Sequence, residues 1–188
     1  SSEDVNSILN NIAQPQNNYD IIELEKAPKI AVYSPQNKQP WDDAVTLVLE
    51  YAEIPYDVIY DEEILSNLLP LYDWLHLHHE DFTGQYGKFY RSFKNAPWYI
   101  EQKKIFEKDA LAQGYDKVSK HKLAVVNKIQ EYTAGGGFLF AMCSATDTYD
   151  IAISAQTTDI CEYMFDGDPM DQNAQNKLNF FETFAFEN

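Results

Sequence analysis

The segment Gly135-Gly136-Gly137-Phe138-Leu139-Phe140-Ala141-Met142-Cys143-Ser144-Ala145-Thr146-Asp147 carries the strongest structural signal in this chain. Three glycines lead into a short apolar run. A single cysteine follows, and then a polar group of residues that is suited to begin a helix. This order predicts a buried strand over residues 138–142, a sharp turn, and a helix N-terminus with the thiol at the apex.

Such a turn has the features of a nucleophile elbow. The residues two before and two after the nucleophile must be small, because the turn brings backbone very close, and Ala141 and Ala145 meet that condition. A thiol at a helix N-terminus also feels the positive end of the helix dipole, which favours the thiolate. The alternative is that Cys143 is a buried residue at the end of a core strand, since a cysteine packs well as a small hydrophobe.

Strands and helices alternate along the chain before this segment. The predicted strands cover residues 29–33, 56–60 and 72–78. The predicted helices cover residues 41–52, 98–112, 119–132 and 147–155, with a short helix or turn at 62–69. The order β-α-β-α-β predicts an α/β fold with a doubly wound, mainly parallel, flavodoxin-like sheet and helices on both faces.

Length and charge narrow the possible classes of protein. A chain of 188 residues is expected to form one compact domain with a real core. The formal net charge of −16 argues against a nucleic-acid partner, because phosphates attract Lys and Arg, and also against an anionic membrane surface. No apolar run is long enough to span a bilayer, so we expect no membrane insertion.

The two ends of the chain differ in character from its middle. Residues 1–28 form a polar extension with helical spacing of Val5, Ile8, Leu9 and Ile12, and we expect this short amphipathic helix to pack on a neighbour or on a missing portion of the protein. The α/β domain is predicted over residues 29–165. Residues 166–188 are acidic and aromatic and supply no closing strand and helix, so the domain is expected to be incomplete and to continue into a missing part.

These segments together resemble the class I glutamine amidotransferase-like superfamily. More closely, they resemble a family of Bacteroidota proteins often labelled "asparagine synthetase B". The resemblance covers nearly everything from residue 28 onward. Besides the segment quoted first, it is carried by Lys29-Ile-Ala-Val-Tyr-Ser-Pro, Gln39-Pro-Trp-Asp-Asp, Tyr72-Asp-Trp-Leu-His-Leu-His-His-Glu-Asp-Phe-Thr-Gly-Gln-Tyr-Gly and Ala96-Pro-Trp-Tyr-Ile-Glu-Gln-Lys-Lys.

The resemblance implies a cysteine hydrolase that acts on an amide or related acyl substrate. Its nucleophile matches Cys143, and its oxyanion contribution comes from the loop at residues 80–87 and from the N–H of Ser144. Within that loop, the candidates for oxyanion or substrate binding are Gly84, Gln85 and Gly87. The superfamily's catalytic His and acid lie late in the domain, where this chain offers no matching motif, so the triad is incomplete here and the base is expected from outside these residues.

Two residues of the chain itself are further catalytic candidates. His79 and Glu80 follow a predicted strand, and sheets of this class place their sites at the carboxyl ends of strands, where Cys143 also falls. The alternative for this region is a metal site of His76, His78 and His79 with Glu80 or Asp81. In a strand, however, His76 and His78 point to one face and His79 to the other, so only two would converge, and zinc needs about three protein ligands. No metal and no cofactor are therefore predicted.

Three other features have simpler interpretations. Asp166, Asp168, Asp171 and Asn173 could suggest calcium, but their spacing does not match the EF-hand pattern, so a solvated acidic turn is expected. Cys161 is expected to be structural, on a short strand, although a single bridge to Cys143 is possible. His121 lies between Lys120 and Lys122 and is expected to be exposed.

A second hypothesis is a non-catalytic binding or interaction subunit of a cell-envelope assembly. Relatives in the resembled family begin with a signal-like segment, which implies a periplasmic, cell-envelope or exported protein, with the cytoplasm as the alternative. The partner would be another protein or the missing C-terminal portion, and the small-molecule substrate stays open. A strained backbone at Cys143 with an imidazole in reach would favour chemistry, whereas a relaxed, buried thiol would favour the interaction role.

Overall fold

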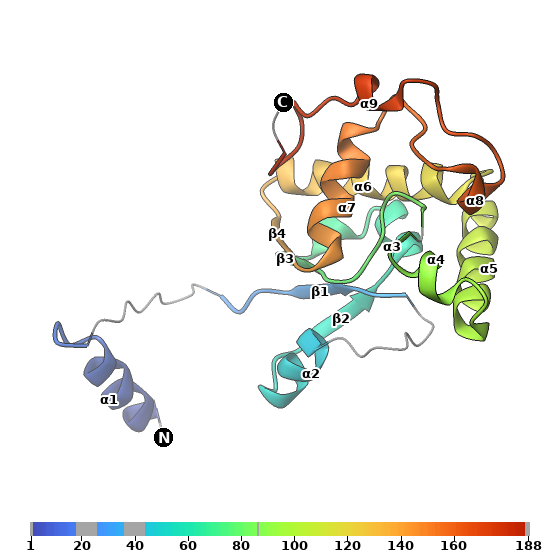
Figure 1. The fold of residues 1–188 in the computed structure, drawn as a ribbon. Coiled ribbons are helices and arrows are strands. Elements are labelled where there is room, and N and C mark those ends of the chain that lie inside the picture. Colours follow the sequence, from blue (N-terminus) through green and yellow to red (C-terminus); the bar gives the residue numbers. More distant parts are fainter. Residues whose placement is uncertain (1, 18–25, 36–43, 86, 187–188) are drawn as a thin grey trace.

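A four-stranded, all-parallel sheet organises the molecule. The computed structural model describes residues 2–17, 26–35, 44–85 and 87–186. The strands are β1 (Ile30–Tyr33), β2 (Tyr56–Ile59), β3 (Trp74–Leu77) and β4 (Phe138–Ala141). Their order across the sheet is β2-β1-β3-β4. This mixed α/β arrangement is consistent with the predicted flavodoxin-like class, and Figure 1 shows α1 apart from the body that holds the sheet.

The helices occupy the predicted connections, with some differences in extent. They are α1 (Ser2–Ile12), α2 (Ala44–Tyr51), α3 (Asp61–Leu65), the 3-10 turn η1 (Leu69–Leu71), α4 (Gly87–Phe93), α5 (Pro97–Ala112), α6 (Val118–Ala134), α7 (Ser144–Ser154), α8 (Tyr163–Asp166) and α9 (Ala174–Lys177). The first three residues of the helix predicted over 41–52 lie outside the described residues. Part of the long connection predicted after β3 is helical, as α4. No helix within the described ranges is long and apolar enough to cross a membrane.

The main core lies on one face of the sheet. The pairing register aligns Ala31 with Leu75 and Leu75 with Leu139, so alternate residues of neighbouring strands share a face. Here Ala31, Leu75 and Leu77 are fully buried. Helices α3, α6 and α7 cover this face through Ile64, Val125, Val126, Ile129, Ala145 and Tyr149.

The inward side of α6 contains two polar residues that the sequence pattern did not predict to be buried. The buried residues of this helix are Val118, His121, Lys122, Val125, Val126, Ile129 and Tyr132, which follow helical spacing. The prediction that His121 is exposed is therefore wrong, because the flanking lysines obscured the stripe. Lys122 is buried as well, since its ammonium binds Asp61 at 2.7 Å and the hydroxyl groups of Tyr33 and Tyr60 at 2.8 and 2.9 Å.

The other face of the sheet is only partly covered. Leu49 of α2 packs against Ile30 and Val32. On the same face, Phe138 and Phe140 of β4 have 57% and 43% of their surface exposed. The prediction of a buried strand before Cys143 is therefore wrong for this side of β4, because no described helix packs over it.

Candidate functional site

Cys143 lies at the turn between β4 and α7. Its backbone has φ 52° and ψ −135°, a combination that glycine adopts easily and that a residue with a Cβ adopts only under strain of about 1–3 kcal/mol. The residue caps the N-terminus of α7, and its side chain is exposed. Ala145 is fully buried, as the close approach of backbone in such a turn requires. The predicted strand, sharp turn and helix N-terminus are all present at this place.

Hydrogen bonds hold the turn against the end of β3. The backbone N–H of Met142 donates to the carbonyl oxygen of Leu77 at 2.9 Å, and that of Ala145 lies 3.3 Å from the carbonyl oxygen of His78. Because β3 and β4 are adjacent parallel strands, their carboxyl ends meet at one edge of the sheet. The turn that carries Cys143 and the residues after β3 therefore border the same site.

The loop after β3 is fastened to the first turns of α7. The Ser144 hydroxyl donates to the carbonyl oxygen of His79 at 2.9 Å, and the Thr148 hydroxyl lies 2.9 Å from the carbonyl oxygen of Glu80. The Glu80 carboxylate accepts the backbone N–H of His78 at 2.7 Å, so it stabilises the bend of its own loop. Of the predicted site residues, the structure thus brings Ser144, His79 and Glu80 to the turn at Cys143.

The remaining loop candidates lie in other surroundings. Gly84 has φ 75°, and a Cβ there would lie 2.7 Å from the Ser119 backbone, so its place is set by close packing on α6. The carbonyl oxygen of Gly84 accepts a hydrogen bond from the Cys161 thiol, with 3.6 Å between sulfur and oxygen. The side-chain amide of Gln85 donates to the carbonyl oxygen of Ile160 at 2.8 Å. Gly87 is the first residue of α4. The structure therefore ties Gly84 and Gln85 to α6 and to residues 160–161.

The histidines do not pair as the strand periodicity predicted. Strand β3 ends at Leu77, so His78 and His79 follow it, and their ring centroids are 3.6 Å apart. His76 is buried in the sheet and stacks on Phe140 with centroids 5.5 Å apart. The rings of His76 and His78 are 6.1 Å apart, and the expectation that His79 points away from His78 is wrong, because their rings are only 3.6 Å apart.

Three carboxylates surround one lysine at the start of α6. Asp159, Asp166 and Asp168 form the one described group of His, Cys, Asp or Glu close enough for a metal. The Lys117 ammonium lies 2.8, 3.3 and 2.7 Å from their oxygens. Burial acts to lower the pKa of Lys117, but the hydrogen bonds to Asp159 and Asp168 raise it above its usual value. A protein cation thus occupies the place that a calcium ion would take.

Asp171 and Cys161 belong to this part of the chain but have separate contacts. Asp171 accepts the Thr158 hydroxyl and pairs with Lys177, both at 3.0 Å. Cys161 is buried, and burial together with Asp166 raises the pKa of its thiol to about 12. It lies in irregular backbone, so the predicted short strand is wrong, and both Cys161 and Cys143 are thiols.

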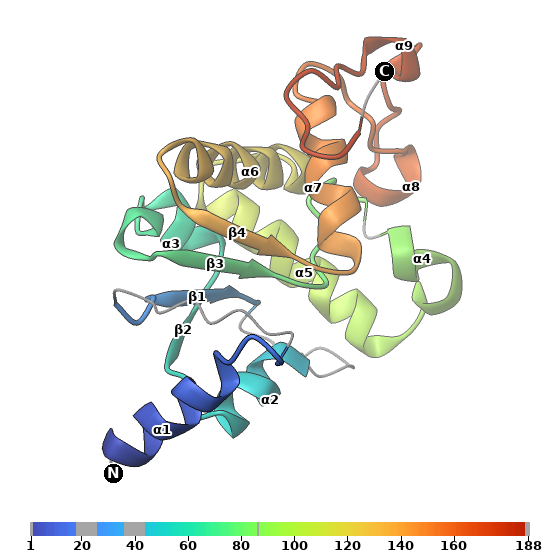
Figure 2. The same cartoon turned by 90° about the vertical axis from the view of Figure 1, so that its left-hand side faces the viewer.

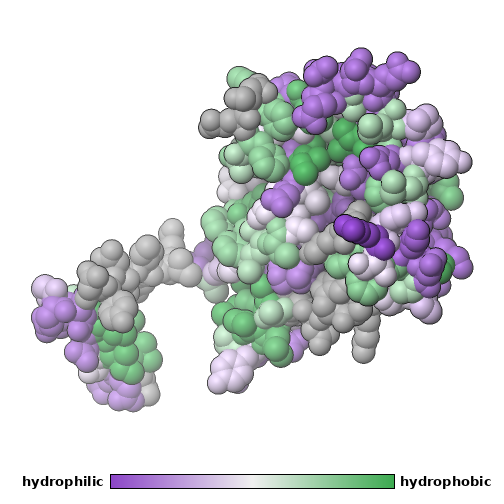
Figure 3. All heavy atoms as spheres, viewed as in Figure 1, coloured by the Kyte–Doolittle hydropathy of each residue, from purple (hydrophilic) through white to green (hydrophobic). Residues whose placement is uncertain are grey.

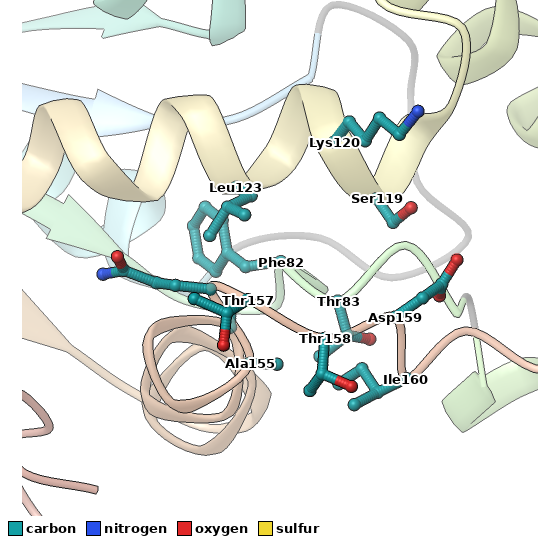
Figure 4. Close-up of a pocket in the computed structure, with 12 residues that line it drawn as sticks. Phe82, Thr83, Ser119, Lys120, Leu123, Ala155, Thr157, Thr158, Asp159 and Ile160 are labelled. Atoms are coloured by element: carbon teal, nitrogen blue, oxygen red, sulfur yellow. The ribbon is translucent and has the colours of Figure 1, made fainter. Parts of the chain in front are cut away.

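A pocket of about 270 Å³ lies behind the same loop. Phe82 and Thr83 of the loop line it together with the start of α6, the end of α7 and residues 156–160. Figure 4 labels Phe82 and Leu123 at one part of the pocket and Thr83, Thr158 and Ile160 at another. One loop therefore contributes both to the turn at Cys143 and to this pocket.

Some residues that shape the site gave no recognisable signal in the sequence. Thr148 holds the loop, yet a threonine one helical turn after Ser144 is ordinary in a helix. The ammonium groups of Lys117 and Lys122 bind carboxylates that lie far away in the sequence, such as Asp168 and Asp61, so no local pattern indicated these contacts. Comparisons of the chain with family models, with curated proteins and with solved structures gave no match.

Proposed function

We propose that this chain is an amidotransferase-like cysteine hydrolase domain that acts on an amide or related acyl substrate. The observation that carries the proposal is the exposed thiol of Cys143 on a strained backbone between a parallel strand and a helix. Strain of this kind collects at functional sites, where the surrounding structure holds a residue in a position it would otherwise leave. The resemblance of residues 28 onward to the amidotransferase-like superfamily supports the same assignment.

The roles follow from the positions at the carboxyl edge of the sheet. The Cys143 sulfur attacks the acyl carbon and forms a thioester, the thiol proton passes to a base, and the base returns it to the leaving amine. We assign the backbone N–H of Ser144, the first residue of α7, as a donor to the oxyanion that develops on the acyl oxygen. Within the described chain we assign the base to His79, which is carried by the loop bonded to Ser144, while Glu80 stabilises that loop. Water then hydrolyses the thioester.

Alkylation with iodoacetamide tests the proposal, because Cys161 serves as an internal control. At pH 7 we expect one modification, at Cys143, faster than that of glutathione, whereas buried Cys161 stays unmodified until unfolding. Intact mass and peptide mapping assign the site. Cys161→Ser should keep the rate, and His79→Gln should lower it several-fold. A Cys143 rate equal to or below that of glutathione would show an ordinary surface thiol and contradict the proposal.

The exposed apolar residues favour a second candidate function. Phe138 and Phe140 present aromatic surface on the sheet, as an interaction subunit of a larger assembly would. In that case the chain would belong to a cell-envelope complex, as the resemblance implies. A slow Cys143 reaction together with retention of a partner that depends on Phe138 and Phe140 would favour this function over hydrolysis.

A further inference from the structure

On one face of the sheet, no helix of the described residues packs over the edge strand β4. Trp74 pairs in register with Ile30 and with Phe138, so all three side chains lie on the face that α2 covers only in part. Four strands about 4.8 Å apart make a sheet roughly 19 Å wide. Helices are about 10 Å across, so such a face takes two of them side by side. Helix α2 packs over β1, and among the described residues no helix packs over β4 on this face.

The figures show the same asymmetry. Figure 2 looks onto this face, and β3 and β4 lie in front with no labelled helix across β4, whereas α5 lies behind. The exposed fractions of Phe138 and Phe140, 57% and 43%, agree with this view. On the opposite face, Leu75 and Leu77 are fully buried. On the α2 face, the exposed apolar side chains of the strands are therefore Phe138 and Phe140 on β4 and Val58 on β2, whereas His76 of β3 is buried.

Helix α1 has the complementary surface. Its apolar side chains are Val5, Ile8, Leu9 and Ile12, which lie on one side of the helix and are 56%, 58%, 39% and 37% exposed. Eleven residues make a helix about 16 Å long, which matches the length of the short strands. Isolated helices of this length are marginal in water, so a stable α1 needs a surface to pack on.

The position of α1 favours docking within its own chain. In Figure 3 the hydrophobic side of α1 is turned toward the α/β body. Residues 13–29 join α1 to β1, and 17 residues reach up to about 56 Å when extended. A tether of this kind gives an effective concentration in the millimolar range, which favours the same chain over a second copy.

We propose that α1 docks on the exposed face of β4 in its own sheet, beside α2, with Ile8 and Leu9 against Phe138 and Phe140. The docked helix would bury two apolar surfaces that are each exposed in the structure, and its Asn and Ser residues would stay in water. The exposed surface of β4 is thus a receptor for an amphipathic helix, and the chain supplies that helix itself. This inference does not depend on the proposed hydrolase function.

Hydrogen exchange on the full chain tests the proposal. We expect the α1 amides to exchange at least tenfold more slowly than an unstructured chain. Ile8→Asp and Phe140→Asp should each remove that protection. Two matched controls place the same charge elsewhere. Asn10→Asp on the polar side of α1 and Leu111→Asp at an exposed position of α5 should leave the protection of the α1 amides unchanged. The amides of α6 report that the body stays folded in every variant.

Three results would overturn the proposal. The first is α1 exchange at the unstructured rate in the unmodified chain. The second is protection that survives both Ile8→Asp and Phe140→Asp. The third is protection that rises with protein concentration together with a dimer in sedimentation, which would assign the surface to α1 of a second copy. Because Ile8 has no place in the core, that variant remains informative even if Phe140→Asp disturbs the sheet.

Discussion

At the scale of single residues, the backbone of Cys143 is the most informative feature. Its φ of 52° and ψ of −135° fit glycine, yet the chain has a residue with a thiol there. Most proteins avoid such strain unless the side chain has a use. Stability and the proposed chemistry therefore make opposite demands on this position.

Replacing Cys143 separates those demands. Cys143→Gly should raise the free energy of unfolding by about 1 kcal/mol, because glycine adopts this backbone without strain, even though it adds flexibility to the unfolded chain. The fast alkylation should disappear in the same variant. Urea unfolding measures the first effect. Cys143→Ala is the control, since it removes the thiol and keeps the strain; equal stabilisation by alanine would show that the backbone at Cys143 is not the cause.

At the scale of elements, α6 joins the sheet through a buried ionic group. Lys122 binds the carboxylate of Asp61 and the hydroxyl groups of Tyr33 and Tyr60 at the carboxyl ends of β1 and β2. Burial and the neighbouring Asp61 raise the pKa of both tyrosines. These buried polar groups are one another's hydrogen-bond and ion-pair partners. Removing one of them therefore leaves a buried charge or hydroxyl group without its partner.

Substitutions at Lys122 and Asp61 should show this dependence. Lys122→Met leaves the Asp61 carboxylate buried without its ion pair, and we expect a loss of about 3–5 kcal/mol. Adding Asp61→Asn removes that charge and should recover part of the loss. Chemical denaturation of the two single variants and the double variant gives the coupling. Additive effects would mean that Lys122 acts through packing alone.

At the scale of the whole molecule, the C-terminal segment is tied to α7. Asp150 is 2% exposed, and its carboxylate accepts the backbone N–H groups of Phe184, Ala185 and Phe186 at 3.0, 2.7 and 3.3 Å. A single carboxylate thus fixes residues 184–186 against the helix that begins at Cys143. These contacts, made 34 to 36 positions apart in the chain, hold residues 184–186 against the α/β body.

Asp150→Ala should release this segment. Three amide donors would lose their acceptor, so we expect a loss of about 1–3 kcal/mol and faster proteolysis within residues 178–186. Limited proteolysis with mass analysis locates the cleavage. Asp147→Ala, at an exposed position of the same helix, should leave the cleavage rate unchanged. Equal protection in Asp150→Ala would show that other contacts hold the segment.

The order of residues alone was enough to predict the parallel α/β class and the strand, turn and helix around Cys143. These features depend on local properties: the period of apolar residues, the glycines before β4, and the small residues Ala141 and Ala145. The same local patterns also suggested that His79 and Glu80 lie near the turn, because the ends of parallel strands share one edge of the sheet.

Other properties were decided only in three dimensions, because they depend on which distant surfaces meet. His121 and Lys122 are buried since α6 turns that side to Asp61, 60 or more positions earlier in the chain. Phe138 and Phe140 are exposed because no described helix covers them, although the apolar run of residues 138–142 predicts a buried strand. Gln85 binds Ile160 instead of facing the turn, and Lys117 gathers three carboxylates, through contacts that no local pattern encodes.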